Sequence, residues 1–249
     1  MISVTILIKN GQRYLHELLS SLSQFNDVVL LDTGSTDKTL EIAAQFSNVT
    51  VYHSEFSGFG ACHNKLSNLA KHDWILSIDA DEIPTPGLIN EILSLQLDDT
   101  CVYSISRKNF YRGKWIKGCG WYPDRVVRLY NKRKTCFSDA KVHESILADS
   151  FKKIALKEPL KHFPYNSIAD FLAKMQSYST LFAEQYRGKR EASLARALFH
   201  GLFAFVKSYI LKRGIFLGSE GFIISCYNAH TAYYKYLKLQ EANKNKGKI

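Results

Sequence analysis

Three carboxylates within four positions, directly after an apolar run, constrain this chain more than any other feature. Residues 74–78 read as a buried strand, and Asp79, Asp81 and Glu82 follow it. Carboxylates this close repel one another unless a cation sits between them. Hard oxygen ligands suit Mg²⁺ or Mn²⁺, which also bind phosphate oxygens. The pattern predicts a metal site at the carboxyl edge of a sheet, and a solvated acidic turn is the alternative.

Strand-like and helix-like segments alternate four times in the first half of the chain. The strand-like runs are residues 2–8, 28–31, 49–52 and 74–78, each joined to the next by a helical pattern. This alternation predicts an α/β fold with a largely parallel sheet covered on both faces. Asp32 ends the second run, so it should share a sheet edge with Asp79. One carboxylate there can bind a base or ribose while the others hold a metal on the phosphates.

Several common classes are excluded by what the sequence lacks. The turn at Gly34 is not a Gly-x-Gly-x-x-Gly fingerprint, and no Walker lysine is present. The five cysteines lack Cys-x-x-Cys spacing, which argues against a zinc site or a disulfide framework and suits a reducing cytoplasm. No leader segment is evident, and no apolar run is expected to be long enough to span a membrane.

The positive charge lies in the last hundred residues. Residues 1–150 hold 16 Lys and Arg against 17 Asp and Glu, whereas residues 151–249 hold 17 against 6. This split predicts a near-neutral domain over 1–150 and a basic helical extension over 151–249, which meets an anionic partner. Apolar helical segments within 193–239 fit either docking on an anionic membrane or a cap packed on the first domain.

The order of motifs resembles a family 2 glycosyltransferase of the GT-A fold, a Rossmann-like nucleotide-sugar-binding architecture. The similarity extends to lipopolysaccharide inner-core glucosyltransferases that modify heptose. It covers the first 150 residues most strongly and rests on these motifs: Lys9-Asn10, Leu31-Asp32-Thr33-Gly34-Ser35-Thr36-Asp37, Gly58-Phe59-Gly60, Ser77-Ile78-Asp79-Ala80-Asp81-Glu82, Trp121-Tyr122-Pro123-Asp124, Arg128-Leu129-Tyr130 and Val142-His143-Glu144.

The resemblance implies a uridine site at the first two turns, formed by Lys9, Asn10, Asp32 and Ser35. Relatives usually carry an acid after the Asn, where this chain has Gly11.

The helix after the glycine turn supplies the next candidates for donor binding, His63, Asn64 and Lys65. Relatives usually have Arg or Lys where His63 stands. A histidine on a phosphate would make donor binding pH-sensitive, since histidine titrates near neutrality. The alternative is a surface histidine on an amphipathic helix.

By the same resemblance, Asp79 contacts the ribose and metal, and Asp81 binds the Mg²⁺ or Mn²⁺ more directly. His143 is an additional candidate ligand, since imidazole tolerates Mn²⁺ well.

An inverting transfer also needs a carboxylate base. Asp124 and Glu144 are the candidates, with Asp124 favoured; an ion pair with Arg125 or Arg128 is the alternative for Asp124. Arg128 is a candidate to face the diphosphate or an acceptor phosphate, and a solvated or paired arginine is the default interpretation.

The implied function is a metal-dependent inverting transfer of a hexose, most simply glucose from UDP-glucose, to an inner-core heptose of a lipid-linked oligosaccharide. The implied location is cytoplasmic, peripheral at the inner face of the bacterial inner membrane. Alternatives are a polyprenyl phosphate or another polysaccharide acceptor, a basic binding protein without activity, or an inactive sugar-binding relative. Nucleic acid is not an expected partner, because the front half is neutral and no nucleic-acid module is evident.

Overall fold

The computed structural model describes residues 1–138 and 145–244, which fold into two compact units. Unit 1 comprises residues 1–108 and 124–162, and unit 2 comprises residues 109–123 and the chain from 163 onward. This division differs from the one expected at residue 150. The last strand of unit 1 continues to residue 162, and the segment 109–123 folds with the helices.

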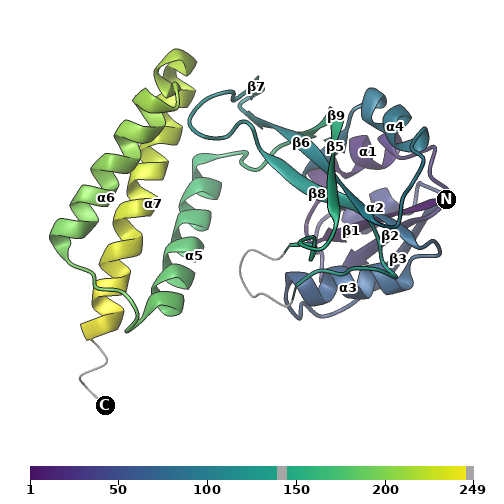
Figure 1. Cartoon of the computed structure of the whole chain (residues 1–249), viewed down its shortest axis with the longest axis horizontal. Coiled ribbons are helices and arrows are strands. Elements are labelled where there is room, and N and C mark those ends of the chain that lie inside the picture. The colour runs from purple at the N-terminus through teal and green to yellow at the C-terminus, as the bar shows by residue number, and fades with distance from the viewer. Residues whose placement is uncertain (139–144, 245–249) are drawn as a thin grey trace. The chain divides into compact units, whose positions relative to one another are not determined.

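Unit 1 is built on one mixed sheet with the strand order β3-β2-β1-β4-β8-β6-β9-β5 (Figure 1). The strands are β1 (Ile2–Ile8), β2 (Val28–Asp32), β3 (Val49–His53), β4 (Trp74–Asp79), β5 (Glu82–Pro84), β6 (Cys101–Tyr111), β8 (Arg125–Asn131) and β9 (Lys152–His162). The first four are parallel neighbours, as the alternation predicts. Beyond β4 the pairing becomes antiparallel, with β8 against β4 and β6 against β8.

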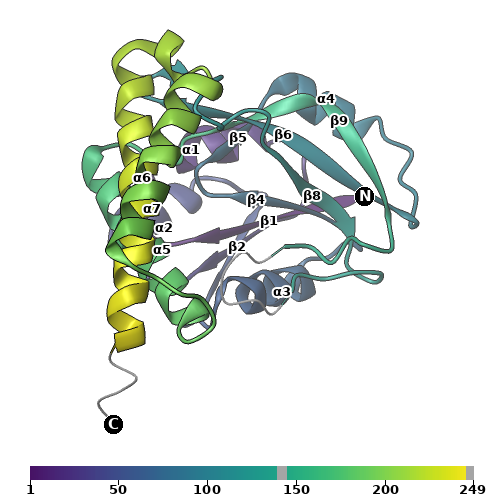
Figure 2. The same ribbon diagram turned by 60° about the vertical axis from the view of Figure 1, so that its left-hand side comes forward.

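Helices cover both faces of this sheet. They are α1 (Gln12–Ser21), α2 (Thr39–Ala43), α3 (Phe59–Leu69) and α4 (Pro86–Leu93). Figures 1 and 2 show α3 on one side and α1 with α4 on the other. β2 is buried at every position, because a central parallel strand meets helices on both faces. The expected α/β fold is confirmed.

Unit 2 is mainly helical. It holds α5 (Ile168–Tyr186), α6 (Leu194–Val206), the π-helical turn η1 (Lys207–Leu211), the 3₁₀ turn η2 (Gly214–Leu217) and α7 (Gly218–Lys244). A short strand, β7 (Lys114–Trp115), pairs with the end of β6. Helix α5 begins at Ile168, directly after Ser167, which forms a reciprocal capping box with Asp170 at the first turn.

One expectation about the helices is wrong. Residues Leu194–Leu211, through α6 and η1, form an 18-residue stretch of mean hydropathy 1.3, long and apolar enough to cross a membrane by length and composition alone. The basic residues Arg196 and Lys207 interrupt this stretch, so the sequence contains no continuous apolar run of that length.

Candidate active site

The turns that follow β1 and β2 are bonded to each other. The backbone N–H of Asn10 donates to Ser35 Oγ at 2.9 Å, and the N–H of Thr36 donates to Asn10 Oδ1 at 2.8 Å. Asn10 has a left-handed φ of 55°, which asparagine tolerates better than most residues. Three of the four predicted uridine residues, Asn10, Asp32 and Ser35, therefore lie together, and the exposed Lys9 precedes them in the same turn.

Asp32 is held ionised at the base of this turn. The backbone N–H of Gly34 donates to its carboxylate at 3.1 Å, as does that of Ser35. Burial alone would raise the pKa of Asp32, but hydrogen bonds from Ser35 and Gly34, with a contribution from His53, bring this pKa below its ordinary value. The carboxylate is buried, and by accepting these two N–H groups it fixes the backbone of the turn.

Gly11, where relatives carry an acid, has little room for a side chain. A Cβ at this position would lie 2.5 Å from Cδ1 of the buried Ile8. Its backbone N–H donates instead to Thr39 Oγ1 at 2.9 Å. An acidic side chain at position 11 would require Ile8 to shift.

The carboxylates after β4 surround a buried guanidinium from the neighbouring strand. Arg128 on β8 is 7% exposed, and its Nη2 donates to Glu82 Oε1 at 2.6 Å and to Asp79 Oδ2. Arg107 on β6 adds a second guanidinium, with Nη1 3.3 Å from Glu82 Oε1. It also binds Asp124 through two nitrogens, Nε to Oδ2 at 2.9 Å and Nη2 to Oδ1 at 3.1 Å.

The pKa values of the two carboxylates nearest Arg128 shift in opposite directions. Burial raises the pKa of Glu82, which is fully buried, above its ordinary value. Burial acts in the same direction on Asp79, but the charge and hydrogen bond of Arg128, together with smaller contributions from His63 and His162, lower the pKa of Asp79. Burial opposes the charge of Arg128, yet Asp79 and Glu82 together raise its pKa, so it stays protonated.

This arrangement shows that two residues considered for binding or catalysis have charged partners in the protein. Arg128 lies beneath the carboxylates and pairs with them, so its guanidinium is already engaged by protein groups. The ion pair considered for Asp124 exists, but its partner is Arg107, not Arg125 or Arg128. Asp124 keeps 27% of its side chain exposed, so it remains a candidate base; Glu144 lies outside the described residues.

Asp81 is more exposed than Glu82 and has a different partner. Its carboxylate is 37% exposed, with Oδ2 3.6 Å from Nε2 of His162. The antiparallel pairing of β5 with β9 sets His162 opposite Glu82 and so brings the imidazole to this edge. His143, the other candidate ligand, lies outside the described residues.

The side chains at this edge fit a hard divalent cation that takes most of its ligands from water and substrate. No group of three or more His, Cys, Asp or Glu side chains is gathered for a metal within residues 1–138 and 145–244. Mg²⁺ commonly takes only one or two carboxylates from the protein and fills its shell with waters and substrate phosphates. The exposed carboxylate of Asp81 and the nearby His162 imidazole offer such a partial shell.

The predicted role of His63 in sensing pH is wrong for this environment. His63 is 4% exposed, and its ring stacks on Phe137 at 4.4 Å between centroids. Burial lowers the pKa of His63 to about 4, so the ring is neutral at pH 6–8. It is a core histidine, neither the surface residue nor the titrating phosphate ligand that was considered.

The two residues after His63 also have protein partners. The amide of Asn64 holds the backbone of Phe137 from both sides, accepting from its N–H at 2.8 Å and donating to its carbonyl at 3.0 Å. Lys65 Nζ donates to Ser54 Oγ at 2.8 Å and stays exposed, so it remains a candidate for a phosphate.

Sequence reasoning gave no role to three residues of this site: Glu82, Arg107 and His162. Glu82 stood in the acidic motif, and its burial could have been anticipated from the apolar Ile83 and Pro84 that follow. No sequence signal marks Arg107 or His162, because long-range strand pairing alone brings them to the edge.

Replacing Arg128 by Met should destabilise the protein by about 3–5 kcal/mol, because it leaves Asp79 and Glu82 partly or fully buried without their main partner. Arg133→Met is the matched control, since the Arg133–Asp73 pair is 72% and 49% exposed and such pairs contribute little. Urea unfolding of both variants measures the difference. Equal losses would show that the buried cluster does not stabilise the fold.

His63→Phe should make stability less sensitive to acid. The unfolded histidine titrates near 6.5 and the folded one near 4, so the unfolded state binds more protons between these values and stability falls as pH is lowered through this window. The wild type should lose roughly 3 kcal/mol more than the variant between pH 7 and 4. Denaturant midpoints across this range test it, with the exposed His16→Phe as control; equal slopes in all three proteins would contradict it.

Comparisons with known proteins agree with this geometry. Residues 3–152 match the model of the family described as Glycosyl transferase family 2. The chain is 28% identical to an uncharacterized glycosyltransferase of Rickettsia bellii, covering 96% of this chain and 86% of the relative. It is 25% identical to the lipopolysaccharide core biosynthesis glycosyltransferase LpsC of Rhizobium meliloti, covering 96% and 92%.

A solved structure supports the fold over nearly the whole chain. The crystal structure of S. aureus TarS 1-349 in complex with UDP-GlcNAc superposes with a TM-score of 0.51 at 14% identity, covering 99% of this chain and 91% of that one. At this identity the likeness concerns the fold alone. With the family match across the sheet and its acidic edge, the chain belongs to glycosyl transferase family 2 and is a glycosyltransferase.

Proposed function

We propose that this enzyme transfers a hexose from a UDP-sugar, most simply glucose from UDP-glucose, to a heptose of the lipopolysaccharide inner core, with inversion and with help from a divalent cation. The observation that carries the proposal is the arrangement at the sheet edge. The hydrogen-bonded turn built on Asp32 and an accessible Asp81 beside His162 both follow parallel strands of one sheet. Open α/β sheets bind ligands at this edge.

In this proposal the turn after β2 receives the uridine. Asp32 is engaged by Gly34 and Ser35, so it fixes the shape of the turn. Lys9 is left exposed at the same turn, and Lys65 on α3 is exposed too. These two ammonium groups supply positive charge for the nucleotide, whereas Asn64 and His63 support the fold.

Asp81, with His162 beside it, would hold Mg²⁺ or Mn²⁺ near the diphosphate. Such a cation supplies Lewis-acid stabilisation of the leaving nucleoside diphosphate. Arg128 and Arg107 contribute positive charge from the protein interior. By neutralising Asp79 and Glu82 they keep the edge from accumulating repelling negative charge, and so they permit a donor with a negatively charged diphosphate to approach.

Asp124 is the proposed general base. The two-point contact with Arg107 fixes the orientation of its carboxylate, and its 27% exposure leaves it accessible to an acceptor hydroxyl. In the reaction this carboxylate takes the hydroxyl proton while the oxygen attacks the anomeric carbon opposite the diphosphate. Glu144 is the alternative base.

The acceptor is the least constrained part of the proposal. Similarity to LpsC over nearly the whole chain favours a lipopolysaccharide core acceptor, at the cytoplasmic face of the bacterial inner membrane. A polyprenyl phosphate or another polysaccharide is the alternative acceptor.

Incubation with UDP-glucose, UDP-galactose and UDP-GlcNAc, with heptose-terminated core oligosaccharide as acceptor, tests the proposal by UDP release. UDP-glucose with Mg²⁺ or Mn²⁺ should support turnover that EDTA abolishes. Asp81→Asn should lower turnover by about 100-fold, because several kcal/mol of charge stabilisation depend on the cation. Asp149→Asn, at an exposed carboxylate of unit 1, should leave turnover unchanged. Metal-independent turnover in both variants would refute the cation site.

Asp124→Asn should reduce kcat by about 10²–10⁴-fold and leave the Kd for the UDP-sugar unchanged, because the amide can still accept from Arg107. Glu144→Gln, measured in parallel, distinguishes the two bases. Loss of kcat in Glu144→Gln alone would transfer the role to Glu144, and loss in neither would reject both assignments.

A further inference from the structure

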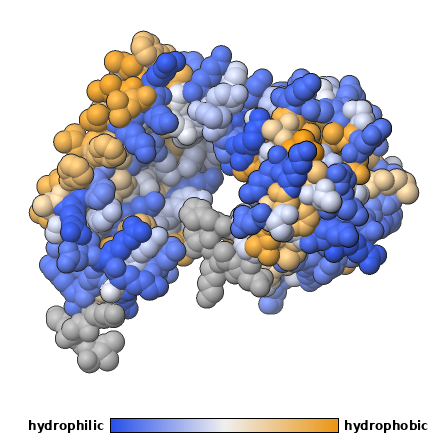
Figure 3. All heavy atoms as spheres, viewed as in Figure 1, coloured by the Kyte–Doolittle hydropathy of each residue, from blue (hydrophilic) through white to orange (hydrophobic). Residues whose placement is uncertain are grey.

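The helical unit exposes an apolar surface that its own fold does not cover. Only 11% of the stretch Leu194–Leu211 is buried, although its composition is that of a core or membrane helix. Figure 3 shows hydrophobic residues gathered along the outer side of α6 and over the turns at its end. We call this the α6 surface; its large apolar side chains, all about half exposed or more, are Leu194, Leu198, Phe199, Leu202, Phe203, Ile210, Leu211, Ile215 and Phe216.

The helix packs onto α7 through small residues. Ala197, Gly201 and Ser208 are buried, and a Cβ on Gly201 would lie 3.2 Å from Cβ of Tyr233. Close approach of the two helices therefore depends on residues with little or no side chain. Phe205 and Tyr209 add ring contacts to Phe222 on α7. The large apolar side chains of the α6 surface nevertheless stay about half exposed or more, so much of their apolar area is left uncovered.

Basic side chains border this surface along one edge. At about 100° per residue, Arg196, Phe203 and Lys207 fall on one line along the helix, and both basic residues are exposed. Exposed Lys212 and Arg213 continue the border after η1. The Lys212 carbonyl accepts from the N–H of Cys119 at 2.8 Å, which anchors the turn that presents Phe216, 82% exposed.

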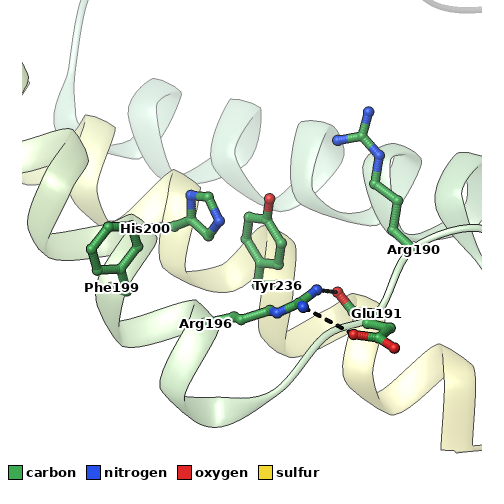
Figure 4. Close-up of a pocket in the computed structure, with 6 residues that line it drawn as sticks. All are labelled: Arg190, Glu191, Arg196, Phe199, His200 and Tyr236. Carbon is green, nitrogen blue, oxygen red and sulfur yellow. Dashed lines mark hydrogen bonds and ion pairs between the residues drawn. The ribbon is translucent and has the colours of Figure 1, made fainter.

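The beginning of α6 carries a second basic feature. A hollow of about 550 Å³ is lined by Arg190, Glu191, Arg196, Phe199, His200 and Tyr236. Figure 4 shows Arg196 bonded to Glu191 and the ring of His200 lying against that of Tyr236, a stack with 4.1 Å between centroids. Phe199 belongs both to this hollow and to the α6 surface, so positive charge and exposed apolar area adjoin here as well.

From this arrangement we propose that the α6 surface docks onto the surface of a membrane containing anionic lipid, with α6 lying in the plane of the interface. An apolar helix face with basic residues at its border is the pattern of interfacial helices. Lys and Arg beside that face attract anionic headgroups. Unit 2 carries 16 Lys and Arg against 5 Asp and Glu, which favours a negatively charged partner over a second copy of itself.

Crossing the membrane is disfavoured by the packing of α6. A spanning helix would have to leave α7, and it would expose the buried faces of Ala197 and Gly201 while carrying Arg196 and Lys207 into the hydrocarbon. Lying in the interface keeps the α6–α7 contact and leaves both charges at the headgroups. Docking of this kind does not depend on which sugar the enzyme transfers.

Co-sedimentation of the full chain with sucrose-loaded vesicles tests the docking without any donor or acceptor. We expect binding to vesicles of phosphatidylethanolamine and phosphatidylglycerol, and at least tenfold weaker binding to phosphatidylcholine alone. The double variant Leu202→Ser with Phe216→Ser should lower the partition coefficient at least tenfold, and Lys207→Ala with Arg213→Ala should reduce the preference for anionic vesicles.

Leu172→Ser is the matched control, because Leu172 on α5 of the same unit is 54% exposed but lies outside the α6 surface. It should bind vesicles like the wild type, and all variants should keep the wild-type melting temperature. Equal binding by the Leu202/Phe216 variant and the control would overturn the proposal. So would no vesicle binding combined with a concentration-dependent dimer that this variant abolishes, because a second copy would then cover the surface.

Discussion

The site depends on burying two guanidinium groups beneath a cluster of acids. Arg128 joins β8 to the end of β4, and Arg107 joins β6 both to Glu82 and to Asp124. Neither charge would be tolerated so far from water without these carboxylates, and the carboxylates would repel one another without the arginines. Each group is therefore held in position by the cost of leaving its partner unpaired. The pairing also ties four strands, β4, β5, β6 and β8, together at the edge where the proposed ligand binds.

This cluster divides the acids of the edge into two groups. Glu82 and Asp79 face the buried arginines and balance their charge, while Asp81 is directed elsewhere and lies near His162. Because Asp79 is 36% exposed, it belongs partly to both groups. A diphosphate with a bound cation would therefore meet one open carboxylate and one partly neutralised one. The interior supplies positive charge close to the phosphates without presenting a free arginine on the surface, as the sequence-based assignment of Arg128 supposed.

Periodicity was sufficient to predict the fold, whereas the partners of charged side chains were not predictable from it. Runs such as residues 28–31 are buried on both faces, and that alone implies a parallel sheet and places Asp32 and Asp79 on one edge. His63 has the spacing of a helix residue, but whether it faces solvent or Phe137 depends on a segment more than seventy residues later in the chain. His162 reaches Asp81 only through the pairing of β5 with β9. Such contacts leave no local signal.

The basic helical unit shows how one helix can satisfy two interpretations of the same sequence. The apolar segment at 193–212 suggested either a packed cap or a membrane-facing surface. Helix α6 does both, because its small residues pack on α7 while many of its large apolar residues stay exposed. Small residues such as Gly201 make the contact with α7, and large ones such as Leu202 remain on the outside. Hydropathy counts both kinds together, so it cannot separate them. The distinction rests on the neighbours of each side chain, because burial of Ala and Gly leaves the apolar area of Leu and Phe available to a partner.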